Sequence, residues 1–184
     1  MSERKHRCVL MAGGVNESLN VRRYQRELVW WSENLDRRGF ECWLCLGDGG
    51  LDTSPAPKAT YTAARGAALQ DALGWLSEVN QEGLAIFVGS NHGYTEGLAL
   101  WGPEYLTPQE LQSALAPAQG TKVLIMGQCY SGVFGQLADQ RTVVLTASTD
   151  NEVSYPCKYP PGPRYDEFLY QLGTALFGAP DDAP

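Results

Sequence analysis

The chain has 184 residues, of which 43% are hydrophobic and 19% are charged, and its formal net charge is −7 at pH 7. This length and composition fit one compact domain with a full core and leave no room for a second domain. The acidic balance argues against binding to nucleic acid or to an anionic membrane, since both require clustered lysine and arginine.

The one basic cluster, Arg4-Lys5-His6-Arg7, forms a short leader at residues 1–7. The apolar stretch that follows, residues 8–14, is too short to span a membrane and lacks the cleavage site of a secretory signal. We therefore expect a soluble, cytoplasmic protein. Its folded domain should cover residues 8–177, followed by a flexible tail at residues 178–184.

Strand-like and helix-like segments alternate along the chain. In order, the expected elements are a strand at 8–12, a helix at 21–38, a strand at 40–46, a helix at 63–79, a strand at 84–88, a helix at 107–115, a strand at 122–126, a helix at 131–138, a strand at 142–146 and a helix at 165–176. The string Thr107-Pro108-Gln109-Glu110 is a capping box with proline at the first helical position. This alternation predicts an α/β fold, a mostly parallel sheet with helices on both faces.

Two segments, residues 47–60 and 150–164, are rich in glycine, proline and polar residues. We expect both to be long loops, and two long loops at one rim of the sheet would suit a substrate cleft.

The chain has five cysteines, an odd number that does not suggest a disulfide framework. Cys42 and Cys45 form a CxxC inside a strand-like run, where side chains three positions apart point to opposite faces. A redox CxxC begins a helix instead, so we interpret these thiols as buried and inert. No second pair of cysteines or histidines completes a zinc site, and we expect neither a metal nor another cofactor.

Two apolar runs end in reactive side chains beside glycine. Ser90-Asn91-His92-Gly93 follows one expected strand, and Cys129-Tyr130-Ser131-Gly132 follows the next. The only other histidine, His6, lies in the leader, so a mechanism that needs an imidazole must use His92. Parallel strands deliver both groups to the same rim of a sheet. The expected helix after Cys129 would favour its thiolate through the helix N-terminus.

Such a Cys–His pair is suited to nucleophilic catalysis on a carbonyl group. The imidazole accepts the thiol proton and later protonates the leaving amine, while the thiolate forms an acyl-enzyme that water resolves. The backbone N–H groups of Gly93 and Cys129 are placed in the sequence to serve as oxyanion donors.

A His-Gly box after one strand and a Cys-x-Ser-Gly box after the next resemble the clan of caspase-like cysteine peptidases, and within it the legumain (C13) family. Two further stretches are similar to that family: Ala12-Gly13-Gly14 with Asn20-Val21-Arg22-Arg23, and Thr146-Ala147-Ser148 with Glu152-Val153-Ser154-Tyr155-Pro156-Cys157. The resemblance runs from about residue 8 to residue 172, and it implies a three-layer caspase-like fold and cleavage of a protein or peptide substrate.

Carried over residue by residue, the resemblance implies that Cys129 is the nucleophile, that His92 is the base and acid, and that Asn20 orients the imidazole. It also implies that the specificity pocket uses Arg22 and Asp166, which together suit a carboxamide side chain. Without the resemblance, each of these residues also has a purely structural interpretation. Arg22 would lie on a solvated helix face, and Asn20 and Asp166 would cap helices. Ser154 and Tyr155 either line the cleft or fold the loop.

The chain departs from the family pattern at two pocket positions. The pocket glutamate, two residues before the nucleophile, is Gly127 here, and the first serine after the glutamate of the last stretch is Val153. Losing a carboxylate while keeping Arg22 makes the pocket less acidic, so aspartate should be accepted better relative to asparagine. We predict cleavage after Asn or Asp. Legumains also carry an aspartate before the catalytic histidine that can form a succinimide, and Asn91 holds this position here.

Other functions remain open at this level. A transpeptidase or transamidase shares the acyl-enzyme and transfers it to an amine. A non-catalytic caspase-like interaction module normally lacks the cysteine or the histidine, and both are present. A flavodoxin-like nucleotide binder fits the order of elements, but the chain has no glycine-rich phosphate loop. Because no long propeptide is evident and the C-terminal extension that gates legumains is absent, we expect control by a partner, by dimerisation or by a cleft loop.

Overall fold

The structure is a computed structural model that describes residues 5–20, 22–49, 59–157 and 165–180. In chain order its elements are β1 (Arg7–Ala12), α1 (Arg22–Asp36), β2 (Glu41–Leu46), β3 (Thr60–Thr62), α2 (Gly66–Ser77), β4 (Leu84–Gly89), β5 (Gly93–Tyr94), β6 (Gly97–Ala99), β7 (Tyr105–Leu106), α3 (Pro108–Leu115), β8 (Thr121–Met126), η1 (Ser131–Leu137), β9 (Thr142–Thr146) and α4 (Glu167–Phe177). The expected leader, tail and long loops fall partly on residues 1–4, 181–184, 50–58 and 158–164, outside the described residues.

Six strands form one parallel sheet in the order β3-β2-β1-β4-β8-β9. Every residue of β1 is buried, which explains why its sequence is apolar without alternation. From β1 the chain builds the sheet outward through β2 and β3, and then returns to β4 on the other side of β1. The strand order therefore reverses between β1 and β4, and ligands of such sheets bind at the carboxyl ends of the strands beside this point.

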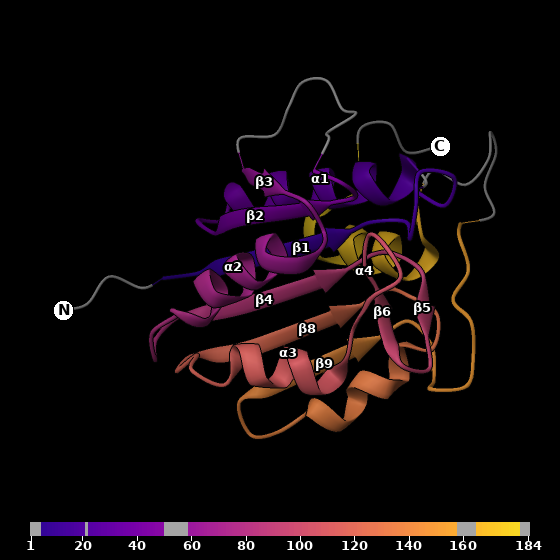
Figure 1. The fold of residues 1–184 in the computed structure, drawn as a ribbon. Coiled ribbons are helices and arrows are strands. Elements are labelled where there is room, and N and C mark those ends of the chain that lie inside the picture. Colours follow the sequence, from indigo (N-terminus) through magenta and orange to yellow (C-terminus); the bar gives the residue numbers. More distant parts are fainter. Residues whose placement is uncertain (1–4, 21, 50–58, 158–164, 181–184) are drawn as a thin grey trace.

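Helices cover both faces of the sheet. α2, α3 and η1 pack on one face around Phe87 and Leu124, while α1 and α4 pack on the other around Leu10 and Ile86. Figure 1 shows α2 and α3 in front of the sheet and α4 behind it. The three-layer α/β fold expected from the sequence is confirmed.

The structure also contains short strands that the sequence did not predict. β3 lies at one edge of the main sheet, and β5, β6 and β7 form a small antiparallel sheet beside the carboxyl ends of β4 and β8 (Figure 1). These strands have two or three residues each, which is too few for a periodic pattern.

One predicted helix was wrong in type. The segment after Cys129 is a 3₁₀ helix, η1, rather than an α-helix over residues 131–138. Its sequence contains Gly132 and Gly135, and two glycines within seven residues weaken an α-helix. The expected stabilisation of a Cys129 thiolate by the N-terminus of an α-helix therefore does not apply, because no α-helix begins there.

The two cysteines of the CxxC string lie on opposite faces of β2. Cys45 lies in the core under α2, whereas Cys42 packs against the opposite core under α1, as expected for positions three apart on a strand. Arg7, expected in the leader, begins β1 and is buried, with ion pairs to Glu41 (Nε to Oε2, 3.1 Å) and Glu78 (Nη1 to Oε2, 2.8 Å). Among the helices of the described ranges, none is both long and apolar enough to cross a bilayer.

Candidate active site

The His92 and Cys129 loops touch at the carboxyl ends of β4 and β8. A Cβ atom placed on Gly93 would overlap the carbonyl oxygen of Cys129 and the side chain of Gln128. Only glycine therefore allows the two backbones to approach this closely. His6, by contrast, lies just before the amino end of β1, where its Nδ1 accepts a hydrogen bond from the N–H of Leu84 (3.2 Å). The sheet thus separates the two imidazoles and places His92 beside Cys129.

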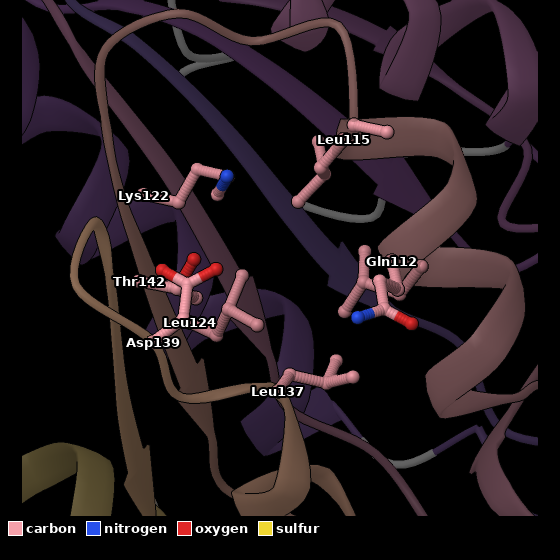
Figure 2. Close-up of a pocket in the computed structure, with 9 residues that line it drawn as sticks. Gln112, Leu115, Lys122, Leu124, Leu137, Asp139 and Thr142 are labelled. Carbon is pink, nitrogen blue, oxygen red and sulfur yellow. The ribbon is translucent and has the colours of Figure 1, made fainter.

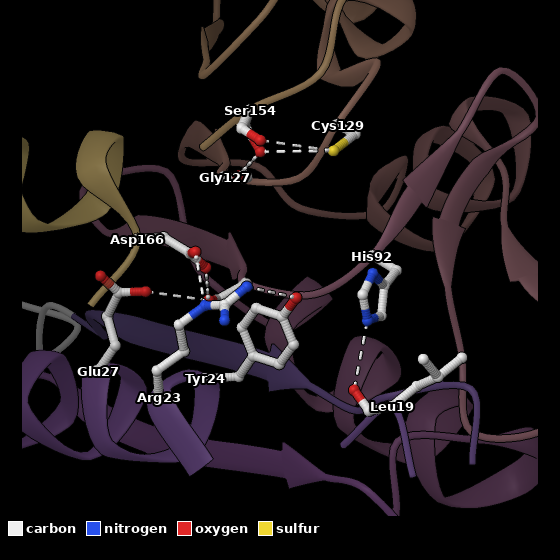
Figure 3. Close-up of polar contacts among 10 residues, drawn as sticks. Leu19, Arg23, Tyr24, Glu27, His92, Gly127, Cys129, Ser154 and Asp166 are labelled. Carbon is white, nitrogen blue, oxygen red and sulfur yellow. Dashed lines mark hydrogen bonds and ion pairs between the residues drawn. The ribbon is translucent and has the colours of Figure 1, made fainter. Parts of the chain in front are cut away.

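The imidazole of His92 is held on two sides. Its Nε2 lies 3.3 Å from the carbonyl oxygen of Leu19. The ring of Tyr24 packs against it edge to face, with ring centroids 5.6 Å apart. If Nε2 carries the hydrogen and donates to Leu19, then Nδ1 is the basic nitrogen. Figure 3 shows the ring edge away from Leu19 turned toward the Cys129 loop.

The thiol of Cys129 is partly buried and faces Ser154. Its Sγ lies 3.8 Å from the carbonyl oxygen and 3.8 Å from the hydroxyl oxygen of Ser154 (Figure 3). The Ser154 hydroxyl in turn donates to the carbonyl oxygen of Gly127 at 3.1 Å. No hydrogen bond joins Cys129 to His92 within the described part of the chain. Rotation about the Cα–Cβ bond of Cys129 is what would bring Sγ toward the imidazole.

The residue after the thiol has a strained backbone. Tyr130 has φ = 54° and ψ = 22°, the left-handed region, and it is the only non-glycine residue with positive φ among those described. Its N–H donates to the carbonyl oxygen of Glu152 at 2.7 Å, which ties the Cys129 loop to the segment that carries Ser154. Strain of this kind gathers at functional sites, where the surrounding structure must maintain it.

An ion pair lies beside His92. Arg23 Nε donates to Asp166 Oδ1 at 3.0 Å, and Arg23 Nη2 donates to the Tyr24 hydroxyl at 3.2 Å (Figure 3). Burial, partly offset by the charge of Arg23, raises the pKa of Tyr24 to about 12, so its hydroxyl stays neutral near pH 7. Because Tyr24 touches both Arg23 and His92, it connects the ion pair to the imidazole.

Asp166 has an ion-pair partner that the sequence did not indicate. Arg23 forms this ion pair, while Arg22, which the family pattern assigns to the pocket together with Asp166, is the exposed first residue of α1, and its role in the pocket stays a prediction. Adjacent helix positions point about 100° apart, so the two arginine side chains leave α1 in different directions. Asp166 lies at the N-cap of α4 without a side-chain capping bond, because its carboxylate is directed to Arg23 and Ser90.

A second carboxyl group, missed by the sequence analysis, lies next to Asp166. Glu27 is fully buried, and the Ser90 hydroxyl lies 3.0 Å from Glu27 Oε2 and 3.3 Å from Asp166 Oδ2. Burial, reinforced by the charge of Asp166, raises the pKa of Glu27 well above its usual range. One signal was present in the sequence: Glu27 falls three positions after Tyr24, on the face of α1 that also carries Leu28, Trp31 and Leu35.

Asn20 and Asn91 are placed by loop contacts. The Asn20 carboxamide accepts from the N–H of Gly14 at 3.5 Å, while the imidazole contact is made by the carbonyl of the preceding residue, Leu19. Asn91 is buried and its Nδ2 donates to the carbonyl oxygen of Ala99 at 2.6 Å, which fastens the loop before His92 to β6. A succinimide at Asn91 and a direct role of Asn20 on the imidazole stay predictions.

The remaining predicted pocket residues lie on the segment that faces the Cys129 loop. Tyr155 is 65% exposed, and Ser154 is half-buried beside Cys129. Gly127 cannot carry the glutamate of the family pattern without a shift, since a Cβ there would lie 2.7 Å from Leu169 Cδ1 on α4. The departure at Gly127 is therefore part of how α4 packs against the sheet.

A separate hollow lies at the other end of β8. Leu111 and Leu115 of α3, together with Leu124, Leu137 and Lys122, line a cavity of about 170 Å³ (Figure 2). Its residues Lys122 and Thr142 lie at the amino ends of β8 and β9, opposite the strand ends that precede His92 and Cys129. The described residues contain no cluster of three or more His, Cys, Asp or Glu side chains that could bind a metal ion.

The family comparison covers the histidine and cysteine loops and begins after α1. The sequence profile of the Peptidase C13 family matches residues 70–177, more than half of the chain, including His92, Gly93, Cys129 and Asp166. No curated protein matches the chain. The matched segment carries the histidine loop and the cysteine loop in the expected order, on the three-layer fold that the sequence predicted. The chain therefore belongs to the Peptidase C13 family of cysteine peptidases.

Proposed function

We propose that this protein is a cysteine endopeptidase that cleaves peptide bonds after Asn or Asp through Cys129 and His92. Membership of the Peptidase C13 family supports cysteine peptidase activity in general and a protein or peptide substrate. The observation that supports the finer proposal is the close approach of Gly93 to the Cys129 backbone, because it brings the loops that carry the imidazole and the thiol together.

The reaction begins with a proton transfer. Nδ1 of His92 accepts the proton of the Cys129 thiol, and Sγ attacks the carbonyl carbon of the scissile bond. The carbonyl oxygen takes the electron pair. When the tetrahedral intermediate collapses, the C–N bond breaks and the imidazolium gives its proton to the amine. Water then attacks the thioester, with His92 as the base, and releases the acid and the thiol. In this scheme the carbonyl of Leu19, at 3.3 Å from Nε2, stabilises the imidazolium.

The N–H of Gly93 is a good candidate for an oxyanion donor. The N–H of Ala99 donates to the carbonyl of His92 at 3.0 Å, so these two residues are a hydrogen-bonded pair of the β5–β6 hairpin. Bonded and non-bonded pairs alternate along antiparallel strands, and Gly93 lies opposite Leu98 at the next position. The Gly93 N–H therefore points away from β6. Together with the N–H of Cys129, it would bind the developing oxyanion.

The residues beside His92 support a small polar side chain before the scissile bond. Arg23 and Asp166 present a donor and an acceptor next to each other, which is what a carboxamide requires. Gly127 contributes no carboxylate, so the pocket repels an aspartate side chain less than the family pattern would. We assign Ser154, beside the thiol, and the exposed Tyr155 to the substrate-binding surface.

The proposal is tested with peptides that differ only at the residue before the scissile bond, and with an electrophilic peptide carrying Asn or Asp at that position. We expect cleavage after Asn and Asp, and mass spectrometry should find the label on Cys129. Cys129→Ala and His92→Ala should abolish cleavage, while Cys42→Ala, at a partly buried thiol beneath α1, should leave it intact. A preference for Lys or Arg, or labelling of Cys45 or Cys157 in place of Cys129, would overturn the assignment.

The same acyl-enzyme can also be taken by an amine. Product analysis with and without an added amine nucleophile distinguishes hydrolysis, which yields a free acid, from transfer, which yields a new amide.

A further inference from the structure

Glu27 is a carboxyl group inside the core, directly beneath the candidate active site. It has no exposed surface, and its Oε1 has no hydrogen-bond partner among the described residues. Its Oε2 lies 3.0 Å from the hydroxyl of Ser90, and the backbone N–H of Asp166 also interacts with the carboxyl group. An ionised carboxylate in such a place would lack both water and a cation of its own, and this is strongly unfavourable.

The hydroxyl of Ser90 determines where the protons must be. Its oxygen lies within hydrogen-bond distance of two carboxyl groups, Glu27 at 3.0 Å and Asp166 at 3.3 Å. A serine hydroxyl has one hydrogen to donate, and otherwise it accepts. Both contacts are satisfied only if one carboxyl group is protonated and donates to Ser90, while Ser90 donates to the other.

The charges around the pair show which group carries the proton. Asp166 has the Arg23 guanidinium at 3.0 Å, which favours its ionised form. Glu27 has no such partner in the described structure. The charges are thus balanced when Arg23 is positive, Asp166 is negative and Glu27 is neutral. The hydrogen bonds then run in one direction, from Glu27 to Ser90 to Asp166.

We propose that Glu27 is held as a neutral carboxylic acid and that, through Ser90, it is a positioning residue for Asp166 in the substrate pocket. Asp166 then presents a fixed carboxylate beside His92, with one oxygen on Arg23 and the other on Ser90. The part of this inference that concerns substrate binding rests on the proposed function. The protonation state of Glu27 does not.

Ionisation of Glu27 at higher pH would place a second negative charge next to Asp166. The groups that face Glu27 from the packed elements are Arg23 on α1, Asp166 at the start of α4, and Cys157 on the segment before it. Arg23 is the one cation among them and is already paired. The added charge would therefore displace Asp166, and binding of a substrate with Asn would weaken as the pH rises.

The first test is infrared spectroscopy of the full chain in deuterated buffer near neutral pH. The difference between the wild type and Glu27→Gln should contain the carbonyl band of a protonated carboxyl group, and Ser90→Ala should shift that band. The matched control is Glu33→Gln, an exposed residue of the same helix, whose difference spectrum should contain only carboxylate bands. Absence of a protonated band for Glu27 would overturn its neutral state. The band can also be followed in wild-type protein with labelled glutamate, so the test does not depend on folding of a variant.

The second test is steady-state cleavage of a peptide with Asn before the scissile bond. Glu27→Leu should raise KM about tenfold, the size expected when a buried hydrogen-bond partner is lost, with a smaller change in kcat. Glu27→Gln, which keeps a donor to Ser90, should restore KM, and Glu33→Gln should leave both constants unchanged. The wild-type KM should also rise at alkaline pH where the infrared band disappears, and Glu27→Gln should lack this rise.

The outcomes separate the two proposals. If the wild type cleaves the peptide but Glu27→Leu leaves KM unchanged, the positioning role is wrong and the proposed function stands. If the wild type cleaves no peptide, the proposed function fails, and the positioning role fails with it. In that case the infrared band still decides whether Glu27 is neutral.

Discussion

At the scale of single residues, the ion pair of Asp166 is made by an arginine that the family pattern does not assign to it. The family pattern assigns Arg22 to the pocket, and the structure places Arg23 Nε 3.0 Å from Asp166 Oδ1. The pattern records order along the chain, whereas the pairing depends on the rotation of α1 against the sheet. Rotation is set by Tyr24, Leu28 and Trp31, which bury that face of the helix.

The left-handed backbone of Tyr130 predicts that glycine at this position gives a more stable protein than alanine does. Alanine and glycine both remove the ring, but only glycine accepts φ = 54° without penalty. Tyr130→Gly should therefore have a higher free energy of unfolding than Tyr130→Ala, by about 1 kcal/mol. Urea denaturation of the two variants measures the difference.

The matched control for this prediction is Tyr170, a half-buried tyrosine within α4. There the order should reverse, with Tyr170→Ala more stable than Tyr170→Gly, because glycine is unfavourable inside a helix. The same order at both positions would contradict a strained Tyr130.

At the scale of elements, short segments account for most of the differences from the sequence expectation. The long strands β1, β4, β8 and β9 lie within one residue of their predicted bounds, and β2 starts one residue later than predicted. In contrast, β3, β5, β6 and β7 were not predicted, and η1 was predicted as an α-helix. A run of two or three residues has no period of its own, so its conformation is imposed by neighbouring strands and loops.

The N-terminus of α3 was predicted in detail and is confirmed. The Thr107 hydroxyl accepts from the N–H of Glu110 at 3.2 Å, and the Glu110 carboxylate accepts from the N–H of Thr107 at 2.9 Å. Thr107→Ala should lower the free energy of unfolding by about 1 kcal/mol, because a helix N–H loses its partner. Thermal unfolding checks this, with the exposed Gln109→Ala on the same helix as control. Equal stability of the two variants would rule out a capping contribution.

At the scale of the whole molecule, the buried carboxyl groups link stability to pH. The pKa of Glu27 is raised above its ordinary value of 4.5 by burial and by the charge of Asp166, while the hydrogen bond from Ser90 opposes the shift. Above pH 4.5 the unfolded chain loses this proton and the folded chain keeps it. Unfolding then releases a proton, so the contribution of Glu27 to the free energy of unfolding falls as pH rises, by at most about 1.4 kcal/mol per pH unit.

Urea denaturation of the wild type and of Glu27→Gln at pH 5 and at pH 8 tests this linkage. The wild type should lose stability relative to Glu27→Gln between the two values, because glutamine has no proton to release. Titratable groups remote from Glu27 are the same in both proteins, so their contributions cancel in the comparison. Glu33→Gln should show no such change relative to the wild type. A constant difference between wild type and Glu27→Gln would mean that Glu27 is ionised in the folded state across this range.

The sequence by itself determined the α/β class, the long strands, the capping box of α3, and the two loops that carry His92 and Cys129. These features depend on residues adjacent in the chain: apolar runs, glycines beside reactive groups, and cap residues at fixed spacing. The tertiary structure decided what the sequence left open: the contact of the imidazole with the carbonyl of Leu19, the ion pair of Arg23 with Asp166, and a buried carboxyl group at Glu27. The reason is physical. These contacts join segments that are distant in the chain. Packing against the sheet sets both the rotation of α1 and the conformation of each loop.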